Sequence, residues 1–265
     1  MTLQDIRYAV DTERHIATLT LDRPDAANAY SEAMVDAIVT ALERADQAPD
    51  VRVLIVTGQG RFFSAGGDLQ QMKKHEGMFY GDPAELRKSY LYGIQRVPQA
   101  FARFRKPTLA AINGAAIGAG LDLACMCDIR VGSNRAKFGS TFIQLGLVPG
   151  DGGAHFLAKV VGFPRALELI LTGRIFGAFE ANDLGLLHEM VEPPMVMPKA
   201  LEIAEMIAAH PPEAVSLARS LVYKSWHLDV HESLDLAATY QGIAQNRPEH
   251  DALVDQMIAR TSSKK

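Results

Sequence analysis

Two glycine-rich segments, each following a predicted strand, constrain what this chain can fold into more than any other feature. FFSAGGDL at residues 62–69 follows the apolar run 51–57, and NGAAIGAGLDLACMCDIR at residues 113–130 follows the apolar run 108–112. Small side chains leave peptide N–H groups open to a ligand. If a helix begins at Gly118, its positive dipole end adds to these N–H groups. One N–H from each segment would then form an oxyanion hole.

Composition and charge argue against two classes of protein. The chain has 265 residues, 48% of them hydrophobic, which is enough to bury a sizeable core in one domain or two. The net charge of −4 and the scatter of basic residues among acids argue against nucleic-acid binding. No apolar stretch reaches the roughly 18 residues of a membrane span. Residues 1–15 carry three acids and lack the apolar core of a signal peptide, so we expect a cytoplasmic protein without nucleic-acid or membrane partners.

The sequence indicates neither a metal site nor another common catalytic motif. Cys125 and Cys127 are the only cysteines, and their spacing suits neither a disulfide framework nor a zinc site, so we expect both to be buried and reduced. None of the eight His residues has HExxH spacing. GQGRFF at residues 58–63 lacks the third glycine of a dinucleotide-binding turn, and no GxSxG hydrolase motif is present.

The order of predicted elements is that of an α/β protein. Residues 6–10 and 15–21 alternate like a hairpin, and residues 31–47 have helical spacing, with Ser31 as N-cap and Met34 at N3. Strand and helix then alternate as far as a short strand at residues 129–131, which favours parallel pairing.

The C-terminal part of the chain has only helical patterns, interrupted at Pro211, Pro212 and Pro248. We therefore expect a core at residues 1–197 and a helical region at residues 198–265. That region would pack on the core or be exchanged between subunits, and so serve oligomerisation and closure of the site.

Four motifs together identify the chain as resembling the crotonase (enoyl-CoA hydratase/isomerase) superfamily. LDRPDAANAYSEAMV at residues 21–35 and LGLVPGDGGAHFLAKVVGFPRALELILTGR at residues 145–174 join the two glycine-rich segments in the order typical of that family. The resemblance implies a crotonase-like spiral of ββα units, assembled as a homotrimer or homohexamer. It also implies an acyl-CoA thioester substrate, with coenzyme A as part of the substrate and no separate cofactor.

The resemblance assigns site residues position by position. The two oxyanion donors fall on the backbone of Ser64 and Ala119, and the CoA phosphate end falls near residues 23–28. The remaining substrate and CoA contacts fall on Arg23, Ala26, Asn28, Ala65, Gly66, Gly67, Asp68, Leu69, Gly118 and Phe142.

The acidic positions depart from the hydratase pattern. In the family's hydratases two Glu residues share water activation and proton transfer. The first falls on Asp122, whose reach is about 1 Å shorter. The second falls on Phe142, which cannot transfer a proton, but Asp151 follows nine residues later. Members that isomerise dienes, displace halide or cleave carbon–carbon bonds carry Asp close to that place.

We interpret Asp122 and Asp151 as a pair that moves protons between carbons. Two structural alternatives remain open at this stage. Asp151 is also a suitable N-cap for a helix starting near Gly152. Asp122 would also suit the solvated first turn of a helix, where the dipole favours acids.

Residues 70–96 form the least patterned stretch and, by the resemblance, close over the acyl group. Candidates for the pocket wall are Met72, His75, Met78, Phe79, Tyr80, Tyr90 and Tyr92. The alternative is a surface loop followed by an amphipathic helix. His75 could also serve as an acid or base, although its place between Lys74 and Glu76 is typical of a solvated side chain.

The expected activity is hydration or double-bond isomerisation of an enoyl-CoA. The alternatives are dienoyl-CoA isomerisation, hydrolysis or C–C cleavage through Asp122 and Asp151, or a non-catalytic homologue that binds CoA esters or a protein or RNA partner. Phe142 in place of Glu favours the non-catalytic alternative, and the two acids argue against it.

Overall fold

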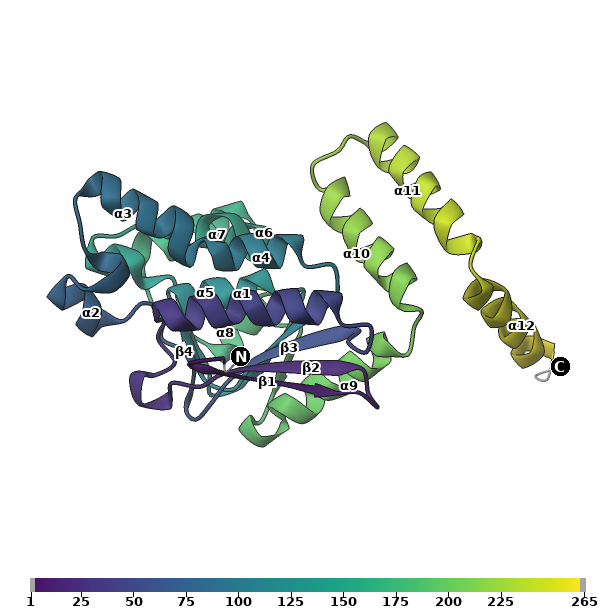
Figure 1. Cartoon of the computed structure of the whole chain (residues 1–265), viewed down its shortest axis with the longest axis horizontal. Helices are drawn as coiled ribbons and strands as arrows, with labels where there is room; N and C mark the ends of the chain where they lie inside the picture. The colour runs from purple at the N-terminus through teal and green to yellow at the C-terminus, as the bar shows by residue number, and fades with distance from the viewer. Residues whose placement is uncertain (1–2, 263–265) are drawn as a thin grey trace.

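The apolar runs of the sequence form the strands of two sheets in the computed structural model, which describes residues 3–262 (Figure 1). The larger sheet has six strands in the order β1-β2-β3-β5-β7-β10. The smaller sheet has four strands in the order β4-β6-β8-β9. Their bounds are β1 Ile6–Asp11, β2 Ile16–Leu21, β3 Val53–Gly58, β4 Phe62–Ser64, β5 Thr108–Ile112, β6 Ala115–Ile117, β7 Ile129–Ser133, β8 Lys137–Gly139, β9 Phe176–Gly177 and β10 Glu189–Val191.

From β3 to β8, successive strands alternate between the two sheets. Each of β3, β5 and β7 lies in the larger sheet, and the short strand that follows it lies in the smaller one. Both series pair in parallel, whereas β1 pairs with β2 antiparallel as the predicted hairpin. Helices follow each such pair of strands, so the chain winds as a spiral of ββα units and the predicted α/β fold class is confirmed.

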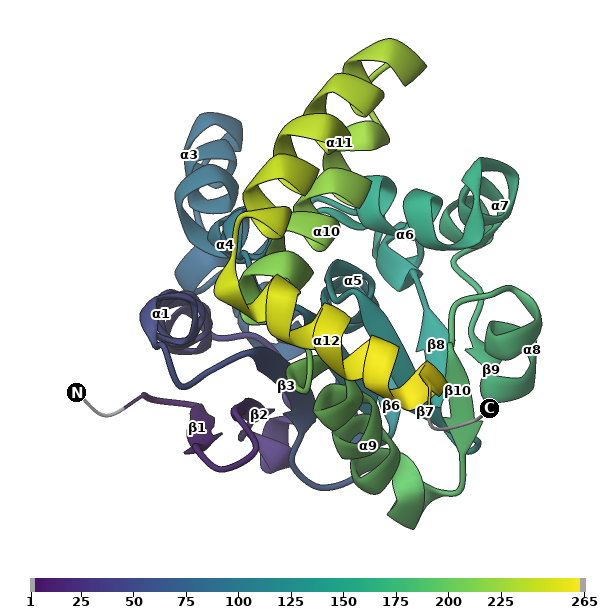
Figure 2. The same ribbon diagram turned by 90° about the vertical axis from the view of Figure 1, so that its right-hand side faces the viewer.

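Helices cover both faces of the larger sheet (Figures 1 and 2). Leu54 and Val56 of β3 belong to the core beneath α1, α4 and α5, whereas Val53 and Ile55 pack with α9 on the other face. Burial on both faces explains why β3 is a continuous apolar run rather than an alternating one. The helices are α1 Glu32–Gln47, α2 Leu69–Lys74, α3 Pro83–Ser89, α4 Arg96–Arg103, α5 Ala119–Met126, α6 Gly153–Val161, α7 Phe163–Thr172, α8 Ala178–Asp183, α9 Val196–Ala208, α10 Pro212–Ser225, α11 Val230–Gln245 and α12 Pro248–Ser262.

Two local predictions are confirmed. The hydroxyl of Ser31 accepts a hydrogen bond from the Met34 N–H at 3.0 Å, which makes Ser31 the N-cap of α1. Cys125 and Cys127 are both buried and free, and burial raises the pKa of the Cys125 thiol to about 12. Neither thiol is therefore available as a reactive thiolate.

The last three helices, α10 to α12, form a C-terminal arm that extends away from the sheets (Figure 1). None of their described residues is buried. The expected boundary at residues 197/198 falls inside α9, which packs on the larger sheet through Ala200 and Ala204. The part of the chain that lies off the core therefore begins after Ala208.

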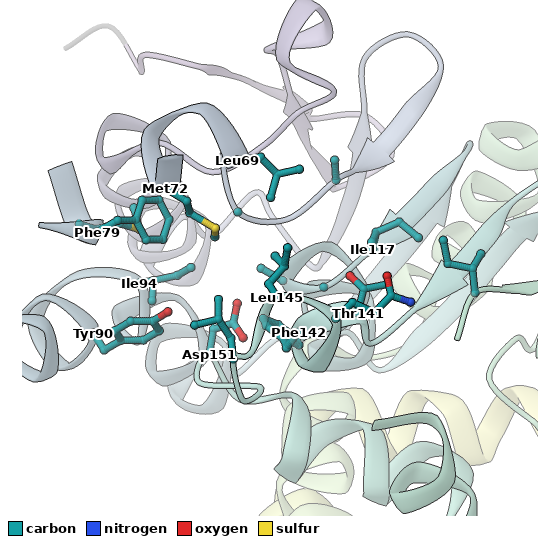
Figure 3. A pocket seen from close by; sticks show the side chains of 18 residues that line it. Leu69, Met72, Phe79, Tyr90, Ile94, Ile117, Thr141, Phe142, Leu145 and Asp151 are labelled. Carbon is teal, nitrogen blue, oxygen red and sulfur yellow. The ribbon is translucent and has the colours of Figure 1, made fainter. Parts of the chain in front are cut away.

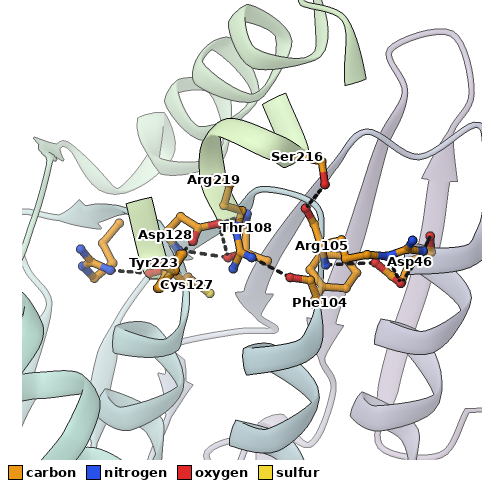
Figure 4. A network of polar contacts seen from close by, with 10 residues as sticks. Asp46, Phe104, Arg105, Thr108, Cys127, Asp128, Ser216, Arg219 and Tyr223 are labelled. Carbon is orange, nitrogen blue, oxygen red and sulfur yellow. Dashed lines mark hydrogen bonds and ion pairs between the residues drawn. The ribbon is translucent and has the colours of Figure 1, made fainter. Parts of the chain in front are cut away.

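Asp128 connects the C-terminal arm to the core (Figure 4). Its Oδ2 accepts hydrogen bonds from the Thr108 N–H at 2.7 Å and from Arg219 Nε at 2.8 Å. Its Oδ1 accepts from the Tyr223 hydroxyl at 2.6 Å. Because Asp128 directly follows the C-cap of α5, residue Cys127, the start of the arm is fixed relative to that helix.

Candidate active site

A cavity of about 260 Å³ opens where the two glycine-rich segments meet (Figure 3). The loop after β4 contributes Gly67, and the start of α5 contributes Gly118 and Ala119. The 3₁₀ turn 141–145 adds Phe142, and the loop before α6 adds Asp151. The fold thus brings together in one site the two glycine-rich segments and the motif at residues 145–174.

The two glycine-rich segments pack tightly enough to require glycine. A Cβ at Gly66, whose φ is +82°, would lie 2.6 Å from the carbonyl oxygen of Ile117 and 2.8 Å from the nitrogen of Ala119. Gly118 is the N-cap of α5 at φ 54°, so Ala119 is the first helical residue, as the sequence predicts. The close approach fixes the loop after β4 against the positive end of the α5 dipole.

Two peptide N–H groups at this junction, those of Gly67 and Ala119, form no hydrogen bond within residues 3–262. Their neighbours are occupied: the Ala65 N–H donates to the carbonyl of Ala27 at 2.9 Å, and the Gly66 N–H donates to the Ser64 hydroxyl at 3.1 Å. Because Gly67 and Ala119 both line the cavity, their N–H groups are open to a ligand there.

Ser64 lies beneath the loop instead of in the cavity. It is fully buried and is not among the residues that line the cavity. Its hydroxyl donates to the carbonyl of Asn28 at 2.8 Å. The sequence places one oxyanion donor on the Ser64 N–H, whereas the residues of this loop that line the cavity are Ala65, Gly67 and Leu69. Which residues reach the cavity depends on how the loop packs on α5, and local sequence does not record that packing.

Asp122 and Asp151 form a buried carboxyl pair. Asp151 is 3% exposed and lines the cavity, whereas Asp122 is 0% exposed and does not reach it. Both oxygens of Asp122 and Oδ1 of Asp151 are buried without a well-formed hydrogen bond in the described part of the chain. The two carboxyls are nevertheless close enough for the charge of one to act on the other.

Burial and mutual repulsion set the protonation of the pair. Burial raises the pKa of Asp122 well above its ordinary value, and the negative charge of Asp151 raises it further. Burial also raises the pKa of Asp151, while its interaction with the Asp122 carboxyl opposes that rise. Two neighbouring buried carboxyls share a proton more readily than both ionise. Asp122 therefore retains the proton more strongly.

The two structural alternatives for these acids are wrong. The N-cap of α6 is Gly152 at φ 108°, and no side chain caps that helix, so Asp151 is not its cap. Asp122 does lie in the first turn of α5, but it is completely buried rather than solvated. A buried carboxyl without a well-formed hydrogen bond lowers the stability of the folded state. Stability alone therefore does not explain why Asp122 is an acid.

Tyr30 is a neighbour of the pair that sequence reasoning missed. Its side chain is 2% exposed, and its hydroxyl has no hydrogen-bond partner in the described structure. Burial and the charges of Asp151 and Asp122 raise the pKa of Tyr30 well above its ordinary value. Its place directly before the Ser31 N-cap looks in sequence like an ordinary apolar position, so no local pattern indicates this proximity.

Phe142 lines the cavity beside the start of α5. A Cβ at Gly118 would lie 3.7 Å from Cζ of Phe142. The phenyl ring therefore occupies space next to the free Ala119 N–H, and it brings no proton-transferring group to that side of the cavity.

The residues assigned to the CoA contacts fall into two groups. Ala65, Gly67, Leu69, Gly118 and Phe142 line the cavity. The others do not: Asn28 is fully buried and its Nδ2 donates to the carbonyls of Gln59 at 3.0 Å and Phe62 at 2.9 Å. It holds the β3–β4 connection to the loop after β2, which is a structural role.

Arg23, Ala26 and Asp68 also lie outside the cavity lining. The Arg23 guanidinium approaches Asp5 and Asp68 at 3.5 Å each, and it remains partly exposed. Asp68 is the N-cap of α2, where its carboxylate accepts from the Gln70 and Gln71 N–H groups. Ala26 belongs to the 3₁₀ turn Pro24–Ala26 and is partly exposed.

The loop at residues 70–96 divides in the same way. Met72, Met78, Phe79 and Tyr90 line the cavity. His75, Tyr80 and Tyr92 are exposed and take no part in its wall. Because His75 is exposed and lies outside the cavity, it does not contact Asp122 or Asp151. Lining residues that the sequence did not single out are Ile94, Ile117, Thr141, Gln144, Leu145, Leu147 and Ile175.

Comparisons with known proteins identify the family of the chain. The model of the enoyl-CoA hydratase/isomerase family matches residues 11–253. A Rhizobium meliloti (strain 1021) protein named "Probable enoyl-CoA hydratase" is 36% identical over 225 residues, 85% of this chain and 84% of its own length. The 2,3-dehydroadipyl-CoA hydratase of Escherichia coli (strain K12) is 34% identical over 241 residues, 90% of this chain and 86% of its own. The solved enoyl-CoA hydratase of Bacillus anthracis superposes with a TM-score of 0.88 at 31% identity, covering 97% of both chains.

The chain belongs to the enoyl-CoA hydratase/isomerase family. It is an enzyme of the enoyl-CoA hydratase/isomerase type, and an acyl-CoA thioester is its class of substrate. Within residues 3–262, no cluster of three or more His, Cys, Asp or Glu side chains has the arrangement of a metal site. Across the same residues, no helix is long and apolar enough to cross a membrane.

Proposed function

We propose that the enzyme moves a double bond of an enoyl-CoA through a thioester enolate. The N–H groups of Gly67 and Ala119 would hold the thioester oxygen, in place of the pair Ser64 and Ala119 expected from the sequence. The support is that Gly67 and Ala119 line the cavity, and that no backbone hydrogen bond among residues 3–262 uses either N–H. The pantetheine arm would lie along Ala65 to Leu69, with the CoA phosphates towards the partly exposed Arg23.

The observation that carries the proposal is the arrangement of the acids. Asp151 is the one carboxyl among the described residues that line the cavity, and Asp122 lies behind it. With a 3-enoyl-CoA, the Asp151 carboxylate takes the proton from C2, and the electron pair moves through C1 to the thioester oxygen. The resulting dienolate takes a proton at C4 from the Asp151 carboxyl, whose proton exchanges with solvent, and the charge returns to give the 2-enoyl ester. Asp122 keeps its own proton and holds Asp151 in place.

This mechanism is tested with a panel of 2-enoyl, 3-enoyl and dienoyl-CoA esters in deuterated water, with products identified by mass spectrometry and NMR. The expected result is interconversion of 2- and 3-enoyl esters with deuterium at C2 and C4. Faster formation of a 3-hydroxyacyl-CoA than of the isomer would contradict it. Binding of CoA esters without any turnover would favour the non-catalytic alternative.

Hydration is the second candidate, because the relatives above are named as hydratases. Against it stands Phe142, which brings no carboxylate to orient water beside Ala119. The same panel repeated in ordinary water separates the two reactions, since hydration adds 18 mass units and isomerisation adds none. Hydrolysis and C–C cleavage, the remaining alternatives, would release a free acid or a shorter ester.

We further propose that the C-terminal arm joins copies of the chain into a homotrimer or homohexamer. The support is that the arm has no buried side chain and exposes a series of large apolar ones: Val222, Trp226, Val230, Leu234, Leu253, Met257 and Ile258. Such surface is usually covered by a partner. Sedimentation of the full chain should give three or six times the monomer mass, and a monomer at micromolar concentration would contradict this. The cytoplasmic location stays a prediction from composition.

A further inference from the structure

One end of the cavity is a hydrocarbon chamber that contains a single phenol. Tyr90, Ile94, Phe79 and Met72 gather at that end, and Ile117 and Thr141 lie at the other, with Asp151 between them (Figure 3). Tyr90 is thus the polar side chain on the far side of Asp151 from Thr141. A ligand whose reacting carbons lie at Asp151 and whose acyl chain continues into this chamber would meet the Tyr90 hydroxyl.

The Tyr90 ring is held by the same loop that carries Asp151. A Cβ at Gly150 would lie 2.9 Å from Cε1 of Tyr90, so the ring lies directly on that glycine. The Gln95 Nε2 donates to the carbonyl of Gly150 at 2.6 Å, and the Gln95 N–H donates to the carbonyl of Tyr90 at 3.0 Å. Tyr90 also opens the π-helical turn Tyr90–Ile94, a wide turn that is frequent at functional sites.

The hydroxyl of Tyr90 has no hydrogen-bond partner among residues 3–262, although the ring is half-buried. Burial and the negative charge of Asp151 raise the pKa of Tyr90, which keeps the hydroxyl protonated and able to donate at neutral pH. A phenylalanine would fill the same space without exposing a polar atom to an apolar chamber. The oxygen is therefore useful where the bound ligand offers it a partner.

We infer that the Tyr90 hydroxyl donates a hydrogen bond to an oxygen on the acyl chain, and that the preferred substrates are enoyl-CoA esters with a carbonyl or hydroxyl oxygen beyond the reacting carbons. This inference rests on the proposed function, because it places the reacting carbons at Asp151. A donor that loses its water on ligand binding discriminates against an acyl chain that cannot replace the lost hydrogen bond. The apolar side chains around Tyr90 accept the remaining methylenes.

The test measures binding, so that it does not depend on turnover. Hexanoyl-CoA, 5-oxohexanoyl-CoA and 6-hydroxyhexanoyl-CoA are titrated by calorimetry into the wild type, Tyr90→Phe and the matched control Tyr92→Phe. Tyr92 lies on the same turn but is 76% exposed, so its hydroxyl is outside the cavity. The wild type and Tyr92→Phe should bind one oxygenated ester about tenfold more tightly than hexanoyl-CoA, the size of one neutral hydrogen bond. Tyr90→Phe should lose this preference and keep its affinity for hexanoyl-CoA.

Three results would overturn the inference. Equal binding of all three esters by the wild type would show that an oxygen on the acyl chain does not contribute to affinity. If Tyr90→Phe still prefers the oxygenated esters, another residue is responsible for that preference. If Tyr90→Phe weakens all three esters equally, its hydroxyl serves Asp151 or the fold instead. Failure of all three esters to bind would instead refute the proposed function, and this result is distinguishable from a lost preference, in which the esters still bind.

Discussion

The carboxyl group of Asp122 lies against Gly153, the first residue of α6: a Cβ at position 153 would fall 2.2 Å from Oδ1 of Asp122 and 2.5 Å from its Cγ. Glycine is therefore required at this position by the acid it faces, and not by its own backbone angles. The contact links the motifs at residues 113–130 and 145–174, because Asp122 and Gly153 lie 31 positions apart in the sequence. The start of α6 thus fixes the acid that stands behind Asp151.

Replacing Gly153 by alanine should displace Asp122 and impair the enzyme. We expect kcat on the best enoyl-CoA substrate to fall about 10²-fold, because a displacement of about 1 Å at a reacting group has that effect. Gly242→Ala in α11 is the control, since nothing lies within 4 Å of a Cβ there. It should leave kcat unchanged and stabilise the fold by about 0.5–1 kcal/mol, provided the arm is folded. Wild-type kcat in Gly153→Ala would show that the position of Asp122 does not matter.

Replacing either acid by asparagine should abolish most turnover. At position 151, an amide keeps the shape of the side chain but cannot accept the proton from the substrate. Because Asp151 faces the cavity, Asp151→Asn should lose the exchange of C2 protons for deuterium altogether. Asp122→Asn removes the proton that the pair shares, so its residual rate should depend differently on pH. Full activity in Asp151→Asn, measured by NMR exchange, would remove Asp151 from the mechanism.

Asp122→Asn should also stabilise the protein at neutral pH. Burial and Asp151 raise the pKa of Asp122 in the folded state, so the folded chain binds that proton more strongly than the unfolded chain does. Stability is therefore lost as pH rises above the unfolded value of about 3.9 towards the folded pKa. The amide does not ionise and avoids this loss. The Tm of the variant should exceed that of the wild type at pH 7, and the difference should shrink towards pH 4.

A Tm difference that is independent of pH would contradict this assignment. Such a result would mean that Asp122 is ionised to the same extent in the folded and unfolded states. Asp36→Asn is a suitable control, because Asp36 is exposed on α1 and no comparable burial acts on it.

The fold was predictable from sequence where local patterns and packing agree. The apolar run at residues 51–57 became β3, and the pair Ser31 and Met34 formed the N-cap of α1. The start of α5 at Gly118 was also predicted, because a positive φ at that position suits glycine. In these places, the choice of residue is dictated by the element that contains it.

The details of the site depend on contacts between distant segments, which local patterns do not record. Whether Ser64 or Gly67 faces the cavity is decided by how the loop packs against Ala119. A solvated first-turn position was the alternative that the sequence left open for Asp122, but the side chain is buried because α6 begins over it. Tyr90 lines the cavity and Tyr92 is exposed because both lie on the π-helical turn 90–94. The spacing rules for α-helices do not predict the width of that turn.

Ala119→Pro tests the proposed oxyanion hole. Of the two proposed donors, Ala119 and Gly67, we choose Ala119 because its backbone position tolerates proline. Ala119 is the first residue of α5, a position where proline is accepted because its N–H has no partner within the helix. Loss of one oxyanion donor should lower kcat about 10²- to 10³-fold. The readout is kcat in a variant shown to be folded and of wild-type mass. Ser64→Ala is the control, because it removes a buried hydroxyl outside the cavity and leaves the backbone N–H groups in place. It should lower stability and leave kcat nearly unchanged. Unchanged kcat in folded Ala119→Pro would exclude Ala119 as a donor.

Phe142→Glu should raise hydration of a short 2-enoyl-CoA above the wild-type rate. Phe142 lies next to Gly118 at the start of α5 and lines the cavity. By the family resemblance, its position is the one expected to carry the second Glu of the hydratases. A carboxylate there would orient water on the substrate while leaving the oxyanion donors and Asp151 intact. Phe142→Gln is the matched control, since it has the same length and polarity without a group that accepts a proton. The glutamate variant should form 3-hydroxyacyl-CoA faster than both the glutamine variant and the wild type, and its isomerisation should slow because water competes for the enoyl ester. Equal hydration in the glutamate and glutamine variants would show that water reaches the double bond without help from this position, and that Phe142 is not what separates isomerisation from hydration.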